Sequence, residues 1–268
     1  MTLLLHISDT HFGTEQAPVV EALVELARAQ PPDLVVLSGD ITQRARPDQF
    51  RAARLLLDRL GAPVLAIPGN HDIPLSLWQR LVQPYARHSA AFGADLQPVF
   101  ASPELLVVGV NTTRPYRHID GAVSAAQIAR VGQWLAGATP AQLRVVVVHQ
   151  PMEVARARDV GDRLHGHAAA QSAWASAGAD LVLGGHIHLP YVAPLAGLAR
   201  AMWVVQAGTA VSSRVRAGVP NSVNLLRWSP LQARCAVEQW DYAAASAAFV
   251  CAKTYSLQVD RERNLHAE

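Results

Sequence analysis

The chain begins with the stretch LLLHISDTH (residues 3–11), an apolar run that ends in a polar cluster containing Asp9 and His11. Further along, four more apolar runs end in the same way, at Gly39-Asp40, Gly69-Asn70-His71-Asp72, His149 and Gly185-His186-Ile187-His188. Apolar runs that alternate with amphipathic helical patterns predict sheets covered by helices. Open α/β sheets place their active sites at the carboxyl ends of strands. We therefore expect these five clusters to form the active site.

The periodicity of apolar residues predicts the individual elements. Expected helices occupy residues 17–30, 48–60, 124–136 and 168–177, and expected strands occupy residues 3–7, 34–37, 64–67, 105–110, 145–148, 181–183, 202–206, 223–228 and 235–240. Residues 1–228 are predicted to form the main domain, and residues 229–268 a C-terminal strand and tail extension. The charged segment 259–263 indicates a solvated tail, with an arm across a partner subunit as the alternative.

The five clusters offer carboxylate and amide oxygens and imidazole nitrogens, without a thiolate. This donor set favours Mn, Fe or Zn in a catalytic site over a cysteine-rich structural zinc. It is large enough for two metal ions, with Asp40 shared between them because a carboxylate has two oxygens. Two-metal sites activate a water and stabilise an in-line displacement at phosphorus.

The order of the clusters, D-x-H, G-D, G-N-H-D, a lone His and G-H-x-H, resembles the calcineurin-like metallophosphoesterases over residues 9–188. The stretches HISDTH (residues 6–11) and PGNHD (residues 68–72) are similar in particular to bacterial class III cyclic-nucleotide phosphodiesterases and glycerophosphodiesterases. The resemblance implies an α/β fold of two packed mixed β-sheets flanked by helices, the αββα sandwich, with metals at the sheet edge.

The resemblance also implies two ligand sets that share one residue. The first metal would be held by Asp9, His11, Asp40 and His188, and the second by Asp40, Asn70, His149 and His186. The expected cofactors are two divalent metal ions, Mn or Fe, with Zn or Co as alternatives. The expected nucleophile is a bridging hydroxide, since a single zinc ion already lowers the pKa of water to about 7.

By the same resemblance, His71 is expected to contact the phosphate and to protonate the leaving oxygen, while Asp72 orients its ring. Asn70 and Arg44 are the other expected substrate contacts. Arg44 aligns with the arginine of an Asp-Arg-Gly motif in Ser/Thr phosphatases, but its flanking residues differ, so a surface arginine is the alternative. His118 and His165 leave substrate contact or simple exposure open.

The expected function is hydrolysis of phosphodiesters, either a cyclic nucleotide such as cAMP or small glycerol and alkyl diesters. One alternative is a phosphomonoesterase or protein phosphatase, and the missing Asp-Arg-Gly counts against a Ser/Thr phosphatase. Another is a lipid-A precursor pyrophosphatase, for which we find no amphipathic membrane-facing segment. The third is a non-catalytic scaffold on the same fold, which the complete ligand set disfavours.

Composition limits the partners and the compartment. The 268 residues have a net charge of +2 and contain no basic stripe with interleaved aromatics, so a long nucleic acid is not expected. No apolar run approaches transmembrane length, and Asp9 follows too soon for a signal peptide. Two cysteines make no disulfide framework. We expect a cytoplasmic protein that acts on a small phosphodiester without a membrane, with a homodimer through the C-terminal extension left open.

Overall fold

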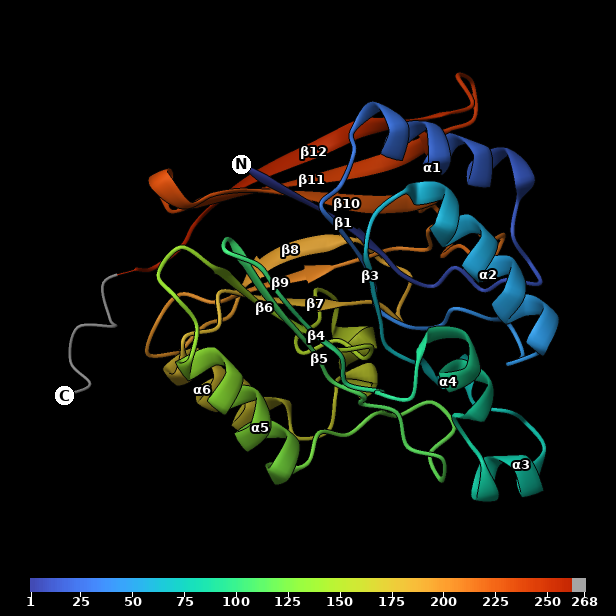
Figure 1. The fold of residues 1–268 in the computed structure, drawn as a ribbon, viewed down its shortest axis with the longest axis horizontal. Coiled ribbons are helices and arrows are strands. Elements are labelled where there is room, and N and C mark those ends of the chain that lie inside the picture. The colour runs from blue at the N-terminus through green and yellow to red at the C-terminus, as the bar shows by residue number, and fades with distance from the viewer. Residues whose placement is uncertain (262–268) are drawn as a thin grey trace.

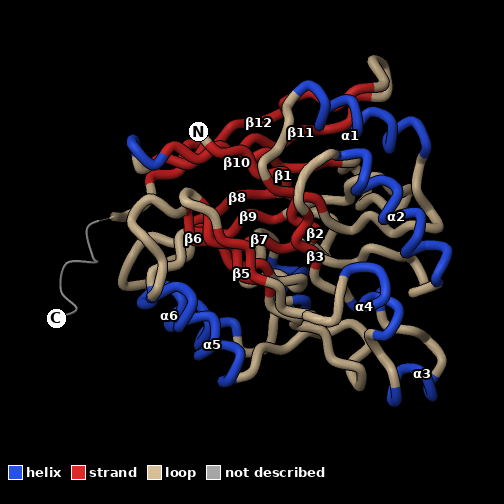
Figure 2. The backbone as a smooth tube through the Cα atoms, in the orientation of Figure 1, coloured by secondary structure: helices blue, strands red, loops and turns tan. Residues whose placement is uncertain are grey.

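The structure of the protein is a computed structural model, and it describes residues 1–261. Within these residues, strands form two six-stranded sheets packed against each other, and helices cover their outer faces (Figure 1, Figure 2). This architecture confirms the predicted αββα sandwich of two mixed sheets. No helix in the described part of the chain has the length and apolar character needed to cross a membrane.

The first sheet has the strand order β12-β11-β10-β1-β2-β3. Its strands are β1 (Thr2–Ile7), β2 (Leu34–Leu37), β3 (Val64–Ala66), β10 (Ser222–Ser229), β11 (Arg234–Ala243) and β12 (Ala248–Gln258). β1, β2 and β3 run parallel, so their carboxyl ends meet at one edge, whereas β10, β11 and β12 add an antiparallel half. The first three polar clusters follow the parallel strands.

The second sheet has the strand order β4-β5-β6-β7-β9-β8. Its strands are β4 (Val99–Ala101), β5 (Leu105–Gly109), β6 (Leu143–Val147), β7 (Leu181–Gly184), β8 (Tyr191–Pro194) and β9 (Trp203–Gln206). The four central strands are parallel, and β4 and β8 are antiparallel at the two edges. His149 and the Gly185–His188 cluster follow β6 and β7.

The helices are α1 (Ala17–Ala29), α2 (Pro47–Leu60), α3 (Leu77–Val82), α4 (Ala86–Phe92), α5 (Ala125–Ala136) and α6 (His167–Ala177), with short 3₁₀ turns η1 (Asn70–Asp72), η2 (Ala157–Asp162) and η3 (Pro230–Gln232). α1 and α2 cover the first sheet, and α5 and α6 cover the second (Figure 1). α2 begins with a proline and ends at Gly61, whose φ of 72° suits a glycine C-cap.

Strand residues alternate between the layers of the core. Leu4 and Val36 cluster with Val145 in the apolar layer between the sheets, whereas Leu5 and Val35 belong to the layer under α1 and α2. Both faces of the central strands are therefore buried. This explains why the sequence shows continuous apolar runs at these strands instead of alternation.

The predicted strands and helices are present with shifted ends, and three further strands and two further α-helices were missed within the described residues. β4 and β8 are short edge strands, and α3 and α4 are short helices without an apolar period. β12 pairs with β11 over its length, but Phe249 and Leu257 are its buried residues, so it lacks the pattern of a core strand. The division at residue 229 stays a prediction, although β11 and β12 continue the sheet of β1 beyond it.

The expectation of a solvated tail is wrong for residues 259–261. Val259 is buried, and the guanidinium of Arg261 stacks 4.7 Å from the ring centre of Trp228. Arg261 also donates to Asp180, which is 1% exposed and accepts hydrogen bonds from Arg200 and from the backbone of Arg144. A buried acid thus fixes the chain after β12 against the second sheet. The rest of the predicted tail, residues 262–263, lies outside the described residues.

We expect Asp180→Ala to lower the free energy of unfolding by about 3–5 kcal/mol, because it leaves two arginines without their buried counter-charge. Urea denaturation followed by circular dichroism measures the change. The matched control is Glu21→Ala, which removes an acid that is 61% exposed from its pair with Arg59 and should not shift the midpoint. Equal midpoints for both variants would show that the Asp180 cluster does not stabilise the fold.

Candidate metal centre

The loops that follow β1, β2, β6 and β7 bring six potential metal ligands together in two groups. The Asp9 group consists of Asp9, His11 and His188, and the Asp40 group consists of Asp40, His149 and His186. Within each group the potential ligand atoms all lie within 4.8 Å of one another. Every one of these residues comes from a cluster that the sequence predicts to form the site.

Asp40 belongs to the second group and also faces a histidine of the first. Its Oδ1 is 3.2 Å from Nε2 of His149, and its Oδ2 is 3.7 Å from Nε2 of His11. The two oxygens of one carboxylate therefore face histidines of different groups. Asn70, at the start of η1, adds its Oδ1 at 3.2 Å from Nε2 of His149, on the side of the Asp40 group. These positions are compatible with the predicted sharing of Asp40 and with Asn70 as a neutral ligand.

The donor atoms fit divalent cations. Oδ1 of Asp9 and Nδ1 of His186 are buried and have no hydrogen-bond partner within the described chain. Nε2 of His11 lies only 3.3 Å from Nε2 of His188. Buried polar atoms are nearly always paired, so converging orphan atoms call for a missing partner. Carboxylate and imidazole donors suit Mn, Fe or Zn, which would supply that partner.

The backbone of the site is strained where the ligands are. Asp9, His11, Asp40, His186 and His188 all have positive φ, between 40° and 74°. Side chains other than glycine rarely adopt this conformation, and it persists where surrounding contacts enforce it. The backbone N–H groups of Asp9 and His11 donate to the carbonyls of Gly39 and Asp40, which holds the β1 and β2 loops together.

Glycine lets the loops approach one another. A Cβ atom on Gly69 would lie 2.0 Å from the backbone nitrogen of Asp40, which is impossible without moving one of the loops. Only glycine fits there. This contact explains the glycine before Asn70, and it lets the N–H of His71 donate to Oδ1 of Asp40 at 2.9 Å.

Contacts behind the histidine rings set their orientation. Nδ1 of His149 lies 2.8 Å from the carbonyl of Ser38, and Nδ1 of His188 lies 2.8 Å from Oγ1 of Thr209, so each Nε2 points into the centre. Burial lowers the pKa of His149, but the carboxylates of Asp40 and Asp9 outweigh it and raise the value to about 9. A proton and a cation therefore compete for the same nitrogen of His149.

Asp72 does not have the role that the sequence suggested. It is fully buried, and its carboxylate accepts hydrogen bonds from the backbone of Ile41, Thr42 and Gly69 and from the hydroxyl of Thr42. The ring of His71 contacts the carbonyl of Gln43 instead, with Nδ1 at 3.0 Å. The structure therefore does not support the expectation that Asp72 orients the His71 ring. Asp72 instead joins the loop after β2 to the loop after β3.

Sequence reasoning missed Arg214. Its Nη1 lies 3.2 Å from Nε2 of His71 and donates to Oε1 of Gln43 at 2.9 Å. A second arginine, Arg216, lies nearby and is paired with Asp159 at 2.6 Å. Both belong to the loop after β9, which has no motif. The available signal was two arginines in a loop that follows a buried strand, where parallel sheets place functional residues.

The centre opens into a hollow of about 380 Å³, which we call the catalytic hollow. It is lined by Asp40, Asn70, His71, Ile119, Asp159, Asp162, His186, Ile187, His188, Arg214 and Arg216. A side hollow of about 170 Å³ shares Asn70, His71 and Ile119 with it. Arg44 and His118 line the side hollow, and Arg44 is exposed. Contact of Arg44 and His118 with a substrate stays a prediction. His165 lines neither hollow and lies 3.9 Å from Asp120, and its contact with a substrate also stays a prediction.

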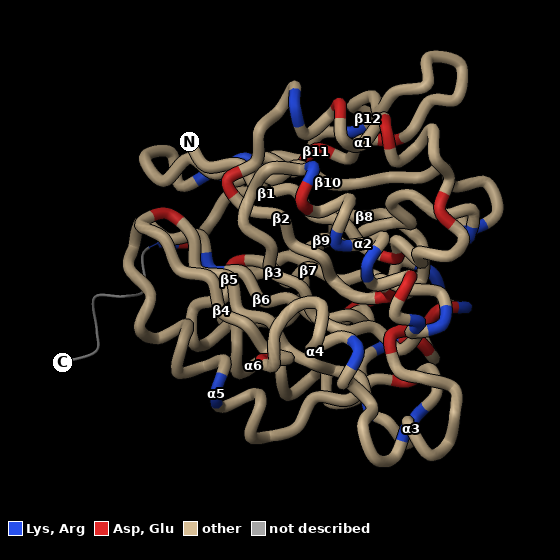
Figure 3. Tube along the Cα trace, turned by 45° about the vertical axis from the view of Figure 1, so that its right-hand side comes forward, with Lys and Arg blue, Asp and Glu red and all other residues tan. Residues whose placement is uncertain are grey.

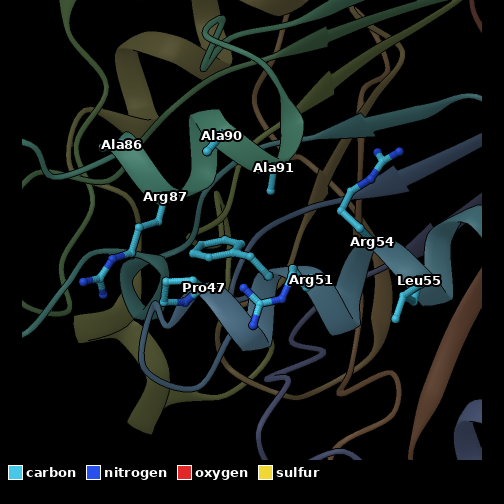
Figure 4. Close-up of a pocket in the computed structure, with 9 residues that line it drawn as sticks. Pro47, Arg51, Arg54, Leu55, Ala86, Arg87, Ala90 and Ala91 are labelled. Carbon is cyan, nitrogen blue, oxygen red and sulfur yellow. The ribbon is translucent and has the colours of Figure 1, made fainter.

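A larger hollow of about 700 Å³ lies between α2 and α4, away from the predicted site residues (Figure 4). It is lined by Pro47, Phe50, Arg51, Arg54, Leu55, Ala86, Arg87, Ala90 and Ala91. None of these side chains is a metal ligand, and Figure 4 shows Arg54 and Arg87 extending to opposite sides. Size alone therefore does not identify the site in this protein.

Solved structures with a similar fold include two phosphatases. A purple acid phosphatase from yellow lupin has a TM-score of 0.72 at 10% identity, covering 96% of this chain and 53% of that one. A dimetal phosphatase from Danio rerio has a TM-score of 0.70 at 14% identity, covering 97% of this chain and 99% of that one. At these identities the likeness shows the fold alone.

Two curated relatives are more similar in sequence than these solved structures, but each matches only part of its own length. The glycerophosphodiester phosphodiesterase GpdQ of Enterobacter lignolyticus is 43% identical over 26% of this chain and 29% of its own length. A cAMP/cGMP dual specificity phosphodiesterase of Mycobacterium tuberculosis is 27% identical over 73% of this chain and 64% of its own length. The matches thus span less than two thirds of these relatives.

Residues 2–190 match the family described as Calcineurin-like phosphoesterase. The matched stretch contains both ligand groups, and it covers strands β1 to β7 together with the five polar clusters. The sequence resemblance, the fold and the arrangement of the donor atoms therefore agree, and the chain belongs to the calcineurin-like phosphoesterase family.

Proposed function

We propose that the protein hydrolyses phosphodiesters with two divalent metal ions bound by the Asp9 and Asp40 groups. The observation that supports this proposal is the position of Asp40, whose two carboxylate oxygens face different histidines at the base of the catalytic hollow. Two of the relatives act on glycerophosphodiesters and on cyclic nucleotides, according to their names. These two diester classes are therefore the first substrates to test.

The proposed ligands of one ion are Asp9, His11, Asp40 and His188, and those of the other are Asp40, Asn70, His149 and His186. When bound, such ions supply positive charge to the phosphate oxygens and lower the pKa of a water. The ligands include two carboxylates against two dications, so the centre keeps a net positive charge. That charge attracts an anionic phosphate to the base of the hollow.

His71 is the proposed donor of a proton to the leaving alcohol. The carbonyl of Gln43 holds its Nδ1, so Nε2 is the nitrogen that faces the hollow. Arg214 contacts that nitrogen and is the nearest cation in the hollow, which makes it a better candidate phosphate contact than Arg44. A guanidinium binds phosphate through two parallel hydrogen bonds.

A phosphomonoesterase is the second candidate, and the two arginines of the hollow are the observation in its favour. A monoester has nearly two negative charges at pH 7, so it gains more from added cations than a diester does. Asp159 neutralises Arg216, however, at a distance of 2.6 Å. Arg214 is then the remaining uncompensated cation of the lining residues, all of which are described. A single uncompensated cation matches the single negative charge of a diester better than the two charges of a monoester.

We expect metal-loaded protein to hydrolyse bis(p-nitrophenyl) phosphate with a higher kcat/KM than p-nitrophenyl phosphate. The protein is first freed of metal and then reloaded with Mn, Fe, Zn or Co, and p-nitrophenol release is followed by absorbance. Activity should depend on the reloaded metal. A higher kcat/KM for the monoester would favour the phosphatase, and no hydrolysis with any metal would favour a non-catalytic scaffold.

Asp40→Ala should remove the shared ligand and therefore lower both the bound metal content and the turnover of the diester. Metal content is measured by atomic emission after gel filtration. The matched control is Asp58→Ala, an exposed acid on α2 paired with Arg54, which should retain wild-type metal and activity. Two tightly bound ions and normal activity in the Asp40 variant would contradict the ligand assignment.

Arg214→Gln should lower kcat/KM for the diester by roughly 10–100-fold, the value of a charge-assisted hydrogen bond of about 1.5–3 kcal/mol. Metal content should not change. Arg44→Gln is the comparison, since Arg44 borders the side hollow and not the catalytic hollow. A larger loss for Arg44→Gln than for Arg214→Gln would return the phosphate contact to Arg44.

A further inference from the structure

The short helix α3 has its polarity reversed. Of its six residues, all of them described, Arg80 is the buried one, at 9% exposure. Leu77, Trp78 and Leu81 are 70%, 74% and 64% exposed. Arg80 donates to the backbone carbonyls of Pro115 and Arg117, which fixes α3 to the loop after β5. A charged residue thus anchors this helix, and its apolar side chains face outward.

The exposed apolar residues of α3 are part of a larger surface that we call the apolar shelf. It consists of Leu75, Leu77, Trp78, Leu81, Val82, Tyr116 and Ile119, each at least 53% exposed. Figure 1 shows α3 at a corner of the molecule away from both sheets, and Figure 3 shows no acidic position on it. Large exposed apolar surfaces of this kind usually mark a binding site.

The shelf continues into the predicted active site. Leu75 and Ile119 line the side hollow together with Asn70 and His71. Ile119 also lines the catalytic hollow, together with the proposed metal ligands His186 and His188. An apolar path therefore leads from the wall beside His71 through the side hollow to α3. The two hollows and the shelf meet at one residue, Ile119.

We propose that the apolar shelf binds the apolar group of an amphipathic phosphodiester whose phosphate lies at the metal centre. The proposal rests on the proposed function and narrows its substrate class. A second copy of the chain would cover the side hollow together with the shelf and so close one wall of the site. A substrate that spans both surfaces covers the shelf and still places its phosphate beside His71. A cyclic nucleotide has no alkyl group that would use Trp78, whereas a diester whose second alcohol is a long alkyl chain has one.

The reaction itself is hydrolysis of one ester bond. Water adds its hydroxyl to phosphorus, the P–O bond to one alcohol breaks, and that alcohol leaves with a proton. The other ester group stays on the phosphate throughout. In an amphipathic diester, binding of this second group on the shelf can therefore orient the phosphate without taking part in the chemistry.

The test uses metal-loaded full-length protein and a series of p-nitrophenyl alkyl phosphates, from methyl to octyl, kept below the concentration of micelle formation. Each fully buried methylene is worth about a fourfold gain. We expect kcat/KM to rise at least about tenfold from methyl to octyl, since partial burial reduces that gain. The double variant Leu77→Ser with Trp78→Ser should flatten this rise. The control Leu231→Ser removes a leucine that is 99% exposed in η3, away from α3, and should keep it.

A wild-type kcat/KM that does not depend on chain length would overturn the proposal, as would the same rise in the double variant. Two further measurements test whether the apolar shelf binds a second copy of the chain or a membrane instead of a substrate. Sedimentation of the wild type as a dimer that the double variant dissociates would make the shelf a homodimer interface. Binding to phosphatidylglycerol vesicles that the double variant loses, with no chain-length effect, would make it a membrane-contact surface.

Binding separates failure of this proposal from failure of the proposed function. If no ester is hydrolysed, calorimetric titration compares octyl phosphate with methyl phosphate on the metal-loaded protein. Octyl phosphate that binds at least about tenfold more tightly, with this preference lost in the double variant, supports the shelf while the proposed activity fails. Equal affinities for the two phosphates overturn the shelf as a binding site for apolar groups.

Discussion

The close approach of five loops around the buried carboxylate of Asp40 is the constraint on which the rest of the site depends. One oxygen of Asp40 lies beside His149 and the other faces His11, and the N–H of His71 donates to the same side chain. Bringing so many polar groups into a buried space is costly unless each finds a partner. Hydrogen bonds to the Nδ1 atoms of His149 and His188 satisfy some of these polar groups. Oδ1 of Asp9 and Nδ1 of His186 have no hydrogen-bond partner in the described chain, and a bound cation would supply one.

The same constraint explains the small residues and the unusual backbone around the centre. Gly69 is needed because its backbone passes too near Asp40 for any side chain, and five of the predicted ligands adopt a positive φ. Asp72 supports this arrangement from behind, since its carboxylate ties the backbone of Ile41 and Thr42 to that of Gly69. An acid next to a predicted catalytic histidine is thus a structural link between two loops.

Local patterns in the sequence predicted the strands, the helices and the positions of the polar clusters, whereas the two-sheet sandwich and the ligand assignment followed from the family resemblance. Buried parallel strands produce continuous apolar runs, and a polar cluster after each run marks the carboxyl edge. Arg214 could not be derived in this way, since its contact with His71 joins residues 143 positions apart without a motif. β12 was missed because an edge strand with an exposed face has no core pattern, and the role of Asp72 was wrong because adjacency to His71 does not imply contact.

Several residues that surround the proposed metal centre lie outside the five clusters. The loop after β9 supplies Arg214, the segment after η1 supplies Leu75 and α3, and the loop after β5 supplies Ile119. Loops on a rigid scaffold vary more readily than strands, so one metal centre can serve different substrates when its loops change. His71 lies between a hollow that contains Arg214 and one that leads to an apolar surface. In the proposed binding mode, the polar and apolar ends of a substrate are both recognised beside this imidazole, so the clusters determine the chemistry and the surrounding loops determine the substrate preference.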